Sequence, residues 1–210
     1  MIVYHYSQTL KEGDRLEPGH SDYTDLCEPF MQALAQSRDC FFGMLLNGRY
    51  MFAVLNRSGL RYWANYTKWA TEGLFEYVRR NEYPQCVSRL KCNYFCTGLD
   101  ESVKMFREDW GEEDEEEKAK MHLFEVEAPE DSLEMRDISI FDAAYDAIDL
   151  KQDIDTAIDL ARKYFAGEHS DNPRWEYLSA GDARAVKDIS HFLHEQRRRK
   201  RKERKESEKE

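Results

Sequence analysis

Three short stretches of the sequence set a polar side chain among aromatic ones. They are Tyr4-His5-Tyr6-Ser7 near the N-terminus, Asn93-Tyr94-Phe95 ahead of a turn, and Trp175-Glu176-Tyr177-Leu178 towards the C-terminus. An imidazole hydrogen-bonds other polar groups, an aromatic face stacks on flat rings, and a carboxylate stabilises positive charge or moves a proton. Each side chain also has a purely structural explanation, as a strand histidine, a core tyrosine and a solvent-facing glutamate.

Common catalytic and metal-binding motifs are absent from the chain. The sequence has no P-loop, no dinucleotide-binding glycine fingerprint, no nucleophile elbow and no zinc-protease helix. Cys86, Cys92 and Cys96 with His122 are the one combination that resembles a zinc set, but no CxxC pair exists. The five cysteines are an odd number, which favours reduced thiols in a cytosol. We therefore expect no metal site.

Local patterns predict the elements that must position these residues. Alternation of apolar and polar residues predicts strands at 2–7, 91–97, 121–127, 175–179 and 183–189, with one short extended piece between residues 10 and 19. Apolar residues at helical spacing predict helices at about 22–37, 67–80, 100–110 and 153–166, and a last helix from about 190. Strands spread unevenly among helices indicate an α+β fold rather than a parallel, doubly wound sheet.

Two segments are harder to interpret. In residues 41–58, Asn47-Gly48 between apolar runs is a hairpin signal, whereas Leu45 and Leu55 fit a buried helix, which we favour. The acidic run 112–117 breaks all periodicity, and because like charges repel and extend a chain, it predicts a solvated loop over 111–120.

Taken together, the three stretches resemble the ADP-ribosyltransferase superfamily, whose members carry a His on the first strand, a Tyr on a middle strand and an acid near a late strand. The run from Leu10 through Gly13-Asp14 to Pro18-Gly19 is similar to the opening of the small bacterial rifampin ADP-ribosyltransferases. Residues 75–89 resemble a family of bacterial and phage proteins related to the same fold. The resemblance covers residues 1–190. It implies a split β-sheet core with a mostly helical insertion at 20–80, followed by a basic helix or tail at 191–210.

The resemblance also implies roles for individual residues, with NAD as the substrate. His5 would hydrogen-bond the adenosine-side ribose, and Tyr94 would stack on the nicotinamide ring. Glu176 would hold the nicotinamide ribose and stabilise the oxocarbenium-like centre that forms when the glycosidic bond breaks. Tyr4 and Ser7 are expected to belong to the same cofactor site. We add Arg89 as a candidate for the phosphates, because a guanidinium binds them bidentately.

The sequence departs from the branch that modifies arginine side chains. That branch carries a second acid or Gln two positions before the catalytic Glu, where this chain has Arg174, and its middle strand reads Ser-Thr-Ser, where this chain has Tyr94-Phe95-Cys96-Thr97. Protein arginines are thus a disfavoured acceptor. Three functions stay open: transfer of ADP-ribose to a macromolecule, a catalytically inactive binding protein of the same fold, and NAD hydrolysis as in a toxin.

Charge is distributed unevenly along the chain. The formal net charge of -11 combines a C-terminal segment, 197–210, that has nine basic and four acidic residues, with an acidic remainder. The basic run 197–205 predicts contact with nucleic acid or an acidic partner, or a solubilising helix end. No apolar run approaches the roughly 20 residues of a membrane span, and the start lacks signal-peptide features, so we expect a cytoplasmic protein that contacts no membrane.

Overall fold

The computed structural model describes residues 1–20, 22–57, 66–110, 115–150 and 153–193. Its strands are β1 (Ile2–Ser7), β2 (Arg15–Leu16), β3 (Asn93–Cys96), β4 (His122–Glu127), β5 (Leu133–Asp137), β6 (Trp175–Ser179) and β7 (Ala183–Asp188). Its α-helices are α1 (Thr24–Gln36), α2 (Arg38–Arg57), α3 (Tyr66–Glu82), α4 (Leu99–Asp109), α5 (Glu115–Ala119), α6 (Ile138–Leu150) and α7 (Ile154–Ala166). Two short 3-10 helices, η1 (Arg89–Lys91) and η2 (Glu130–Ser132), precede β3 and β5.

The strands form one antiparallel sheet in the order β2-β7-β4-β1-β3-β6-β5. β1 pairs with β4 along its whole length, but with β3 only where Tyr4 lies opposite Cys96. The sheet therefore consists of two well-paired halves joined at a narrow seam between β1 and β3. This antiparallel sheet with separate helices confirms the predicted α+β class.

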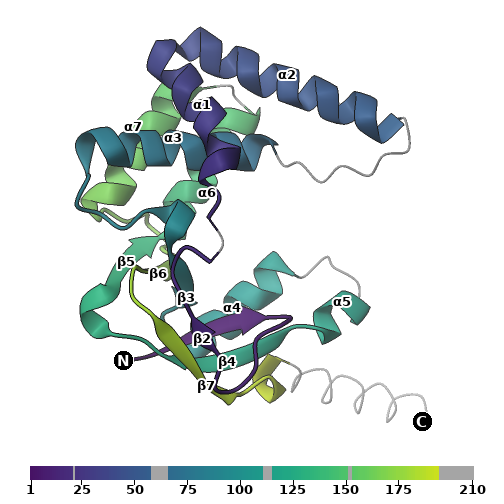
Figure 1. The fold of residues 1–210 in the computed structure, drawn as a ribbon, viewed down its shortest axis with the longest axis vertical. Coiled ribbons are helices and arrows are strands. Elements are labelled where there is room, and N and C mark those ends of the chain that lie inside the picture. The colour runs from purple at the N-terminus through teal and green to yellow at the C-terminus, as the bar shows by residue number, and fades with distance from the viewer. Residues whose placement is uncertain (21, 58–65, 111–114, 151–152, 194–210) are drawn as a thin grey trace.

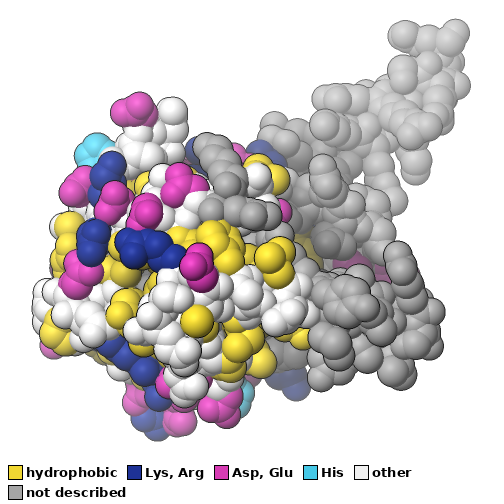
Figure 2. All heavy atoms as spheres, turned by 90° about the horizontal axis from the view of Figure 1, so that it is seen from above, with side chains coloured by type: hydrophobic (Ala, Val, Ile, Leu, Met, Phe, Trp, Pro, Cys, Tyr) yellow, Lys and Arg dark blue, Asp and Glu magenta, His cyan; other side chains and the backbone are white. Residues whose placement is uncertain are grey.

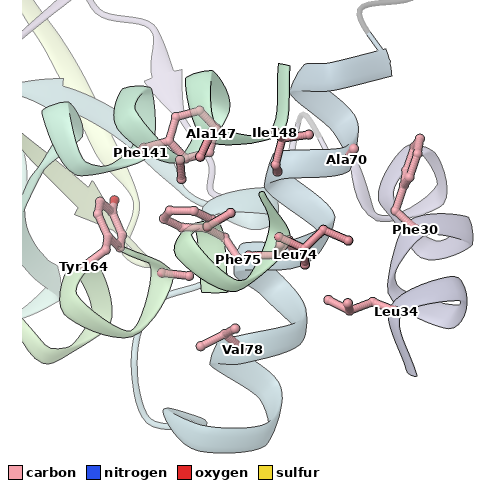
Figure 3. Close-up of a cluster of buried hydrophobic side chains, with 14 of the residues drawn as sticks. Phe30, Leu34, Ala70, Leu74, Phe75, Val78, Phe141, Ala147, Ile148 and Tyr164 are labelled. Atoms are coloured by element: carbon pink, nitrogen blue, oxygen red, sulfur yellow. The ribbon is translucent and has the colours of Figure 1, made fainter. Parts of the chain in front are cut away.

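Helices α1, α2, α3, α6 and α7 gather at one end of the molecule, and α4 and α5 lie beside the sheet at the other (Figure 1). The helical end has its own core, in which Leu74 and Phe75 of α3 meet Phe141 of α6 and Tyr164 of α7 (Figure 3). Leu178 of β6 belongs to the same core, so it ties the helices to the sheet. Burial of this many large side chains supplies the main driving force for docking the two parts.

Helices α3 and α7 follow directly from their sequences. Helix α3 is buried on nearly all sides from Ala70 to Glu76. Gly73 lets α1 approach closely, since an added Cβ would lie 3.0 Å from the carbonyl oxygen of Cys27. Asp153 caps α7 by accepting a hydrogen bond from Thr156 N at 3.0 Å. Gly167 ends α7 in the left-handed region, at φ 78°.

The structure confirms the helix favoured over 41–58, since α2 runs without a break through Asn47-Gly48. Its packing gives the reason. Phe41 and Leu45 are buried, and the Phe41 ring meets Phe30 of α1 edge-on at 6.0 Å. A long apolar face with a partner outweighs a local turn signal.

Three sequence predictions need correction. The acidic loop predicted at 111–120 contains helix α5, where Lys120 pairs with Glu117 at 2.5 Å and with Glu116 at 3.8 Å and so offsets the acid repulsion. The strand predicted from Lys91 begins at Asn93, because Arg89–Lys91 is a 3-10 turn. The sequence patterns also gave no element between Glu127 and Asp153, where the structure has β5 and α6.

Seen from the helical end, apolar side chains are scattered between charged ones (Figure 2). Leu26 of α1, with Met44 and Leu46 of α2, are exposed large apolar residues of this end. Leu26 stands at helical spacing with the buried Phe30 of α1, but it is 49% exposed and lies outside the buried face. No helix in the described ranges is long and apolar enough to span a membrane. Of the predicted C-terminal helix, only residues 191–193 are described, and they are helical.

Candidate functional site

The sheet register brings Tyr94 and Glu176 to one face. β3 pairs with β6 so that Tyr94 lies opposite Leu178 and Cys96 opposite Glu176. Paired residues share a face and alternate residues repeat it, so Tyr94 and Glu176 lie diagonally across the same surface. Tyr4 joins this face because it lies opposite Cys96. His5 is the next residue of β1 after Tyr4, so its side chain leaves the strand on the opposite face of the sheet.

A cavity of about 380 Å³ lies at this place and is lined by His5, Tyr94 and Glu176 together. We call it the Glu176 cavity. The seam explains how His5 reaches it, since β1 and β3 do not pair beyond Tyr4, and His5 Nδ1 bonds across the gap to the Tyr94 carbonyl oxygen. The other lining residues come from four helices, the strands and their connections: Tyr4, Tyr6, Tyr23, Lys68, Trp69, Glu72, Arg89, Phe95, Cys96, Met105, Asp109, Ile138, Phe141 and Asp142.

A second cavity, of about 540 Å³, shares His5, Tyr23 and Tyr94 with the first. We call it the Ser7 cavity. Ser7 lies in its wall, as do Asp14, which precedes β2, and Gly19, which follows it. Two hollows with a common wall would suit a long ligand made of two parts better than a small compact one.

His5 is held as a neutral imidazole. Its Nδ1 lies 2.9 Å from the Tyr94 carbonyl oxygen, and because a carbonyl only accepts, Nδ1 carries the proton. Burial lowers the pKa of His5, although the bond to Tyr94 opposes part of that effect. Its Nε2 is thus a hydrogen-bond acceptor, and it has no partner among the described residues.

The side chain of Tyr94 is held by two contacts with Arg89. Its hydroxyl donates to the Arg89 carbonyl oxygen, and its ring centroid lies 5.1 Å from the Arg89 guanidinium carbon. Burial raises the pKa of Tyr94 well above its ordinary value, so the phenol stays protonated.

Glu176 is almost fully enclosed, at 4% exposure. Its Oε1 accepts from Arg89 Nη1 at 2.6 Å and from the Tyr164 hydroxyl at 2.9 Å. Both hydrogen bonds go to the same oxygen, and Oε2 has none within the described part of the chain. The carboxylate is thus oriented through one oxygen, and the other can accept a further hydrogen bond.

Arg89 is placed differently from what its proposed phosphate role requires. Its side chain lies between two carboxylates, with Nε and Nη2 on Glu72 at 3.0 and 3.2 Å and Nη1 on Glu176. Burial disfavours its charge, but Glu176 and Glu72 raise the pKa of Arg89 well above its ordinary value. To bind phosphates the guanidinium would have to release these partners, so the geometry favours a positioning role over phosphate binding.

Sequence reasoning missed Glu72. It lies on α3 within the continuous buried run from Ala70 to Glu76, so Glu76, one turn later, is buried as well. Two acids on the buried face of a helix require buried partners. That requirement is the signal in the sequence that could have indicated an internal cation such as Arg89.

The remaining candidates occupy separate places. Tyr4 lines the Glu176 cavity and packs on the cluster around Phe106, beside α4. Ser7 lines the Ser7 cavity, where its Oγ accepts from the backbone N–H groups of Thr9 and Leu10 at 3.1 and 3.2 Å. Ser7 therefore closes the turn after β1 as well as contributing to the wall.

The cysteines and His122 that resemble a zinc set in the sequence have other surroundings in the structure. His122 pairs with Asp188 at 3.1 Å, Cys96 is buried in the sheet, and all five cysteines are free thiols. Within the described ranges, no group of three or more His, Cys, Asp or Glu residues is placed to hold a metal ion.

Fold and site together define a class: an antiparallel α+β protein with a polar, partly charged cavity at the seam of its sheet. The chain belongs to the family described as "Protein of unknown function (DUF2441)", whose profile matches residues 21–191. The matched part contains Glu72, Arg89, Tyr94 and Glu176, and it starts after His5. No curated protein matches the chain.

Proposed function

We propose that the protein is an ADP-ribosyltransferase that transfers ADP-ribose from NAD to a macromolecular acceptor. The observation that carries the proposal is the shared cavity of His5, Tyr94 and Glu176, which come from the adjacent strands β1, β3 and β6. The sequence resemblance required these three residues to meet. Fold resemblance alone does not define a function, so the chemistry of the cavity must support it.

The two cavities suit the two halves of a dinucleotide. The nicotinamide riboside would lie in the Glu176 cavity, beside the Tyr94 ring, and the adenosine part in the Ser7 cavity. His5 lies in both walls, and its neutral Nε2 would accept a hydrogen bond from a ribose hydroxyl.

Glu176 would act on the bond between nicotinamide and ribose. As that bond breaks, positive charge develops on the ribose, and a preorganised carboxylate stabilises it most where water is excluded. Glu72 and Glu176 place two negative charges around the one positive charge of Arg89. The cluster therefore keeps a formal charge of about minus one next to the cavity, even though Arg89 is paired.

The acceptor side is shaped by Arg174. Its guanidinium bonds Asp109 at 2.6 Å and Asp142 at 2.9 Å, and both acids line the Glu176 cavity. At this position the arginine-modifying enzymes carry an acid or Gln. Because Arg174 stands in the place of that acid or Gln and is itself tied to acids of the wall, a protein arginine is the less favoured acceptor. The basic run 197–205 lies outside the described residues, and its contact with nucleic acid or an acidic partner stays a prediction.

The test compares wild type with Glu176→Gln and with Glu168→Gln, an exposed glutamate after α7 that serves as the matched control. Each protein is incubated with labelled NAD and cell extract, and both label on macromolecules and free nicotinamide are measured. We expect transfer by wild type and by Glu168→Gln, and a loss of about 100-fold or more in Glu176→Gln. Transfer that survives in Glu176→Gln contradicts the proposal.

One observation favours the inactive binding protein as a second candidate. Glu176 is enclosed, and its Oε1 already has two partners, as in a structural ion pair. NAD binding by calorimetry without nicotinamide release would establish that alternative. Nicotinamide release without label transfer would instead indicate NAD hydrolysis.

A further inference from the structure

Helix α3 presents two buried glutamates, and each holds a different part of the segment that leads into β3. Glu76 accepts from Arg79, Arg80 and the Ser88 hydroxyl, all at 2.9 Å. Glu72, one turn earlier, accepts from Arg89 and from no other residue in the part of the chain that the structure describes. Glu76 therefore fixes the approach to η1, while Glu72 fixes the side chain that touches Glu176.

The Arg89 guanidinium has little freedom to move. Its carbon lies 4.3 Å from the Phe141 ring centroid and 5.3 Å from that of Tyr164, in addition to Tyr94. Nη1 donates to the Tyr164 hydroxyl at 2.6 Å as well as to Glu176. A planar guanidinium held by rings and a bidentate carboxylate directs its remaining N–H bonds along fixed lines.

We propose that Glu72 is a positioning residue: it locks Arg89, and Arg89 in turn holds Oε1 of Glu176 so that Oε2 faces the cavity. The inference rests on the proposed function for its catalytic consequence. The clamp itself, made of Glu72, Arg89 and Glu176, is a structural unit that can be tested without NAD. Glu76 is the matched control, because it is equally buried on the same helix but lies outside the cavity wall and contacts neither Arg89 nor Glu176.

The first arm of the experiment measures coupling by chemical unfolding of Glu72→Gln, Glu176→Gln and the double variant. Either single change leaves Arg89 with one carboxylate partner, whereas the double change leaves the buried guanidinium with no carboxylate partner in the clamp. We expect the double variant to increase the unfolding equilibrium constant by about tenfold or more beyond the product of the single effects. Glu76→Gln combined with Glu176→Gln should stay within about twofold of that product. If the effects of Glu72→Gln and Glu176→Gln on the unfolding equilibrium constant are independent, the inferred clamp is wrong.

The second arm measures nicotinamide release across NAD concentrations. For Glu72→Gln we expect kcat to fall by about tenfold or more, because a misplaced catalytic group loses rate while ligand contacts persist. KM should change by less than about threefold, and Glu76→Gln should keep the kcat of wild type even where it lowers stability. A raised KM with unchanged kcat, or an equal loss of kcat in Glu76→Gln, contradicts the positioning role.

The two arms separate this inference from the proposed function. If wild type releases no nicotinamide, the proposed function fails and the positioning role fails with it, whereas the clamp is still decided by the unfolding cycle. If wild type transfers label to macromolecules and releases nicotinamide but the cycle shows no coupling, the proposed function stands and the inference is wrong.

Discussion

Replacing Arg89 by methionine tests the central feature of the interior. Methionine keeps the length and the apolar stem of arginine but removes the charge and the N–H groups. Glu72 and Glu176 would then remain in the interior, at 5% and 4% exposure, without a cation. Leaving buried charges uncompensated costs about 3–5 kcal/mol, so we expect the free energy of unfolding to fall by about that much at neutral pH.

The pH dependence follows from the raised pKa of Arg89. A group whose pKa is raised on folding contributes stability that is complete below its ordinary, unfolded pKa and is lost only as the pH rises above that value. The contribution of Arg89 in wild type is therefore constant at all lower pH values.

The surface offers a matched comparison. Arg162 also contacts two carboxylates, with Glu82 Oε2 at 2.9 Å and Asp159 Oδ1 at 3.0 Å, but it is half exposed. Exposed pairs contribute between zero and about 1 kcal/mol, so Arg162→Met should cost no more than that. Urea unfolding followed by tryptophan fluorescence and circular dichroism gives both values. Equal losses in the two variants, or a loss below about 1 kcal/mol for Arg89→Met, would refute the reasoning.

Three further predictions concern other residues. The lowered pKa of His5 means that protonation of this residue favours the unfolded chain. Below pH 6.5 the urea midpoint of wild type should therefore fall more steeply with pH than that of His5→Asn. Equal falls of the two midpoints would contradict this prediction. Asp137 is buried, which opposes its ionisation, but backbone N–H groups of 170, 174 and 139 outweigh burial and lower its pKa. Asp137→Asn should therefore lower the free energy of unfolding by about 1–3 kcal/mol near neutral pH. The difference between the two proteins should shrink in acid, where Asp137 of wild type takes up a proton. Gly73→Ala should lower the thermal midpoint despite better helix propensity, because its Cβ would lie 3.1 Å from Phe30 Cβ; a raised midpoint would show that α1 can yield.

Local pattern alone located the parts of the site. Alternation identified the strands that carry His5, Tyr94 and Glu176, and helical spacing identified α3 and α7. Such signals depend only on residues a few positions apart, so they predict a strand or helix in any fold that buries one face of that element. The segment with β5 and α6 carries the same signals, since Leu133-Glu-Met-Arg alternates and Phe141, Ala144 and Ile148 recur at helical spacing, so these two elements were missed although their local pattern was present.

Only the tertiary structure decided how these parts meet. The contact of Arg89 with Glu176 joins residues 87 positions apart, and that with Glu72 joins residues 17 apart across a helix and a turn. Nothing local specifies such pairs, because a charge becomes stable in the interior only when its partner arrives with it. The sequence determined which side chains were present, and the seam between β1 and β3 determined that His5 and Glu176 line one cavity while Arg89 faces inward to carboxylates.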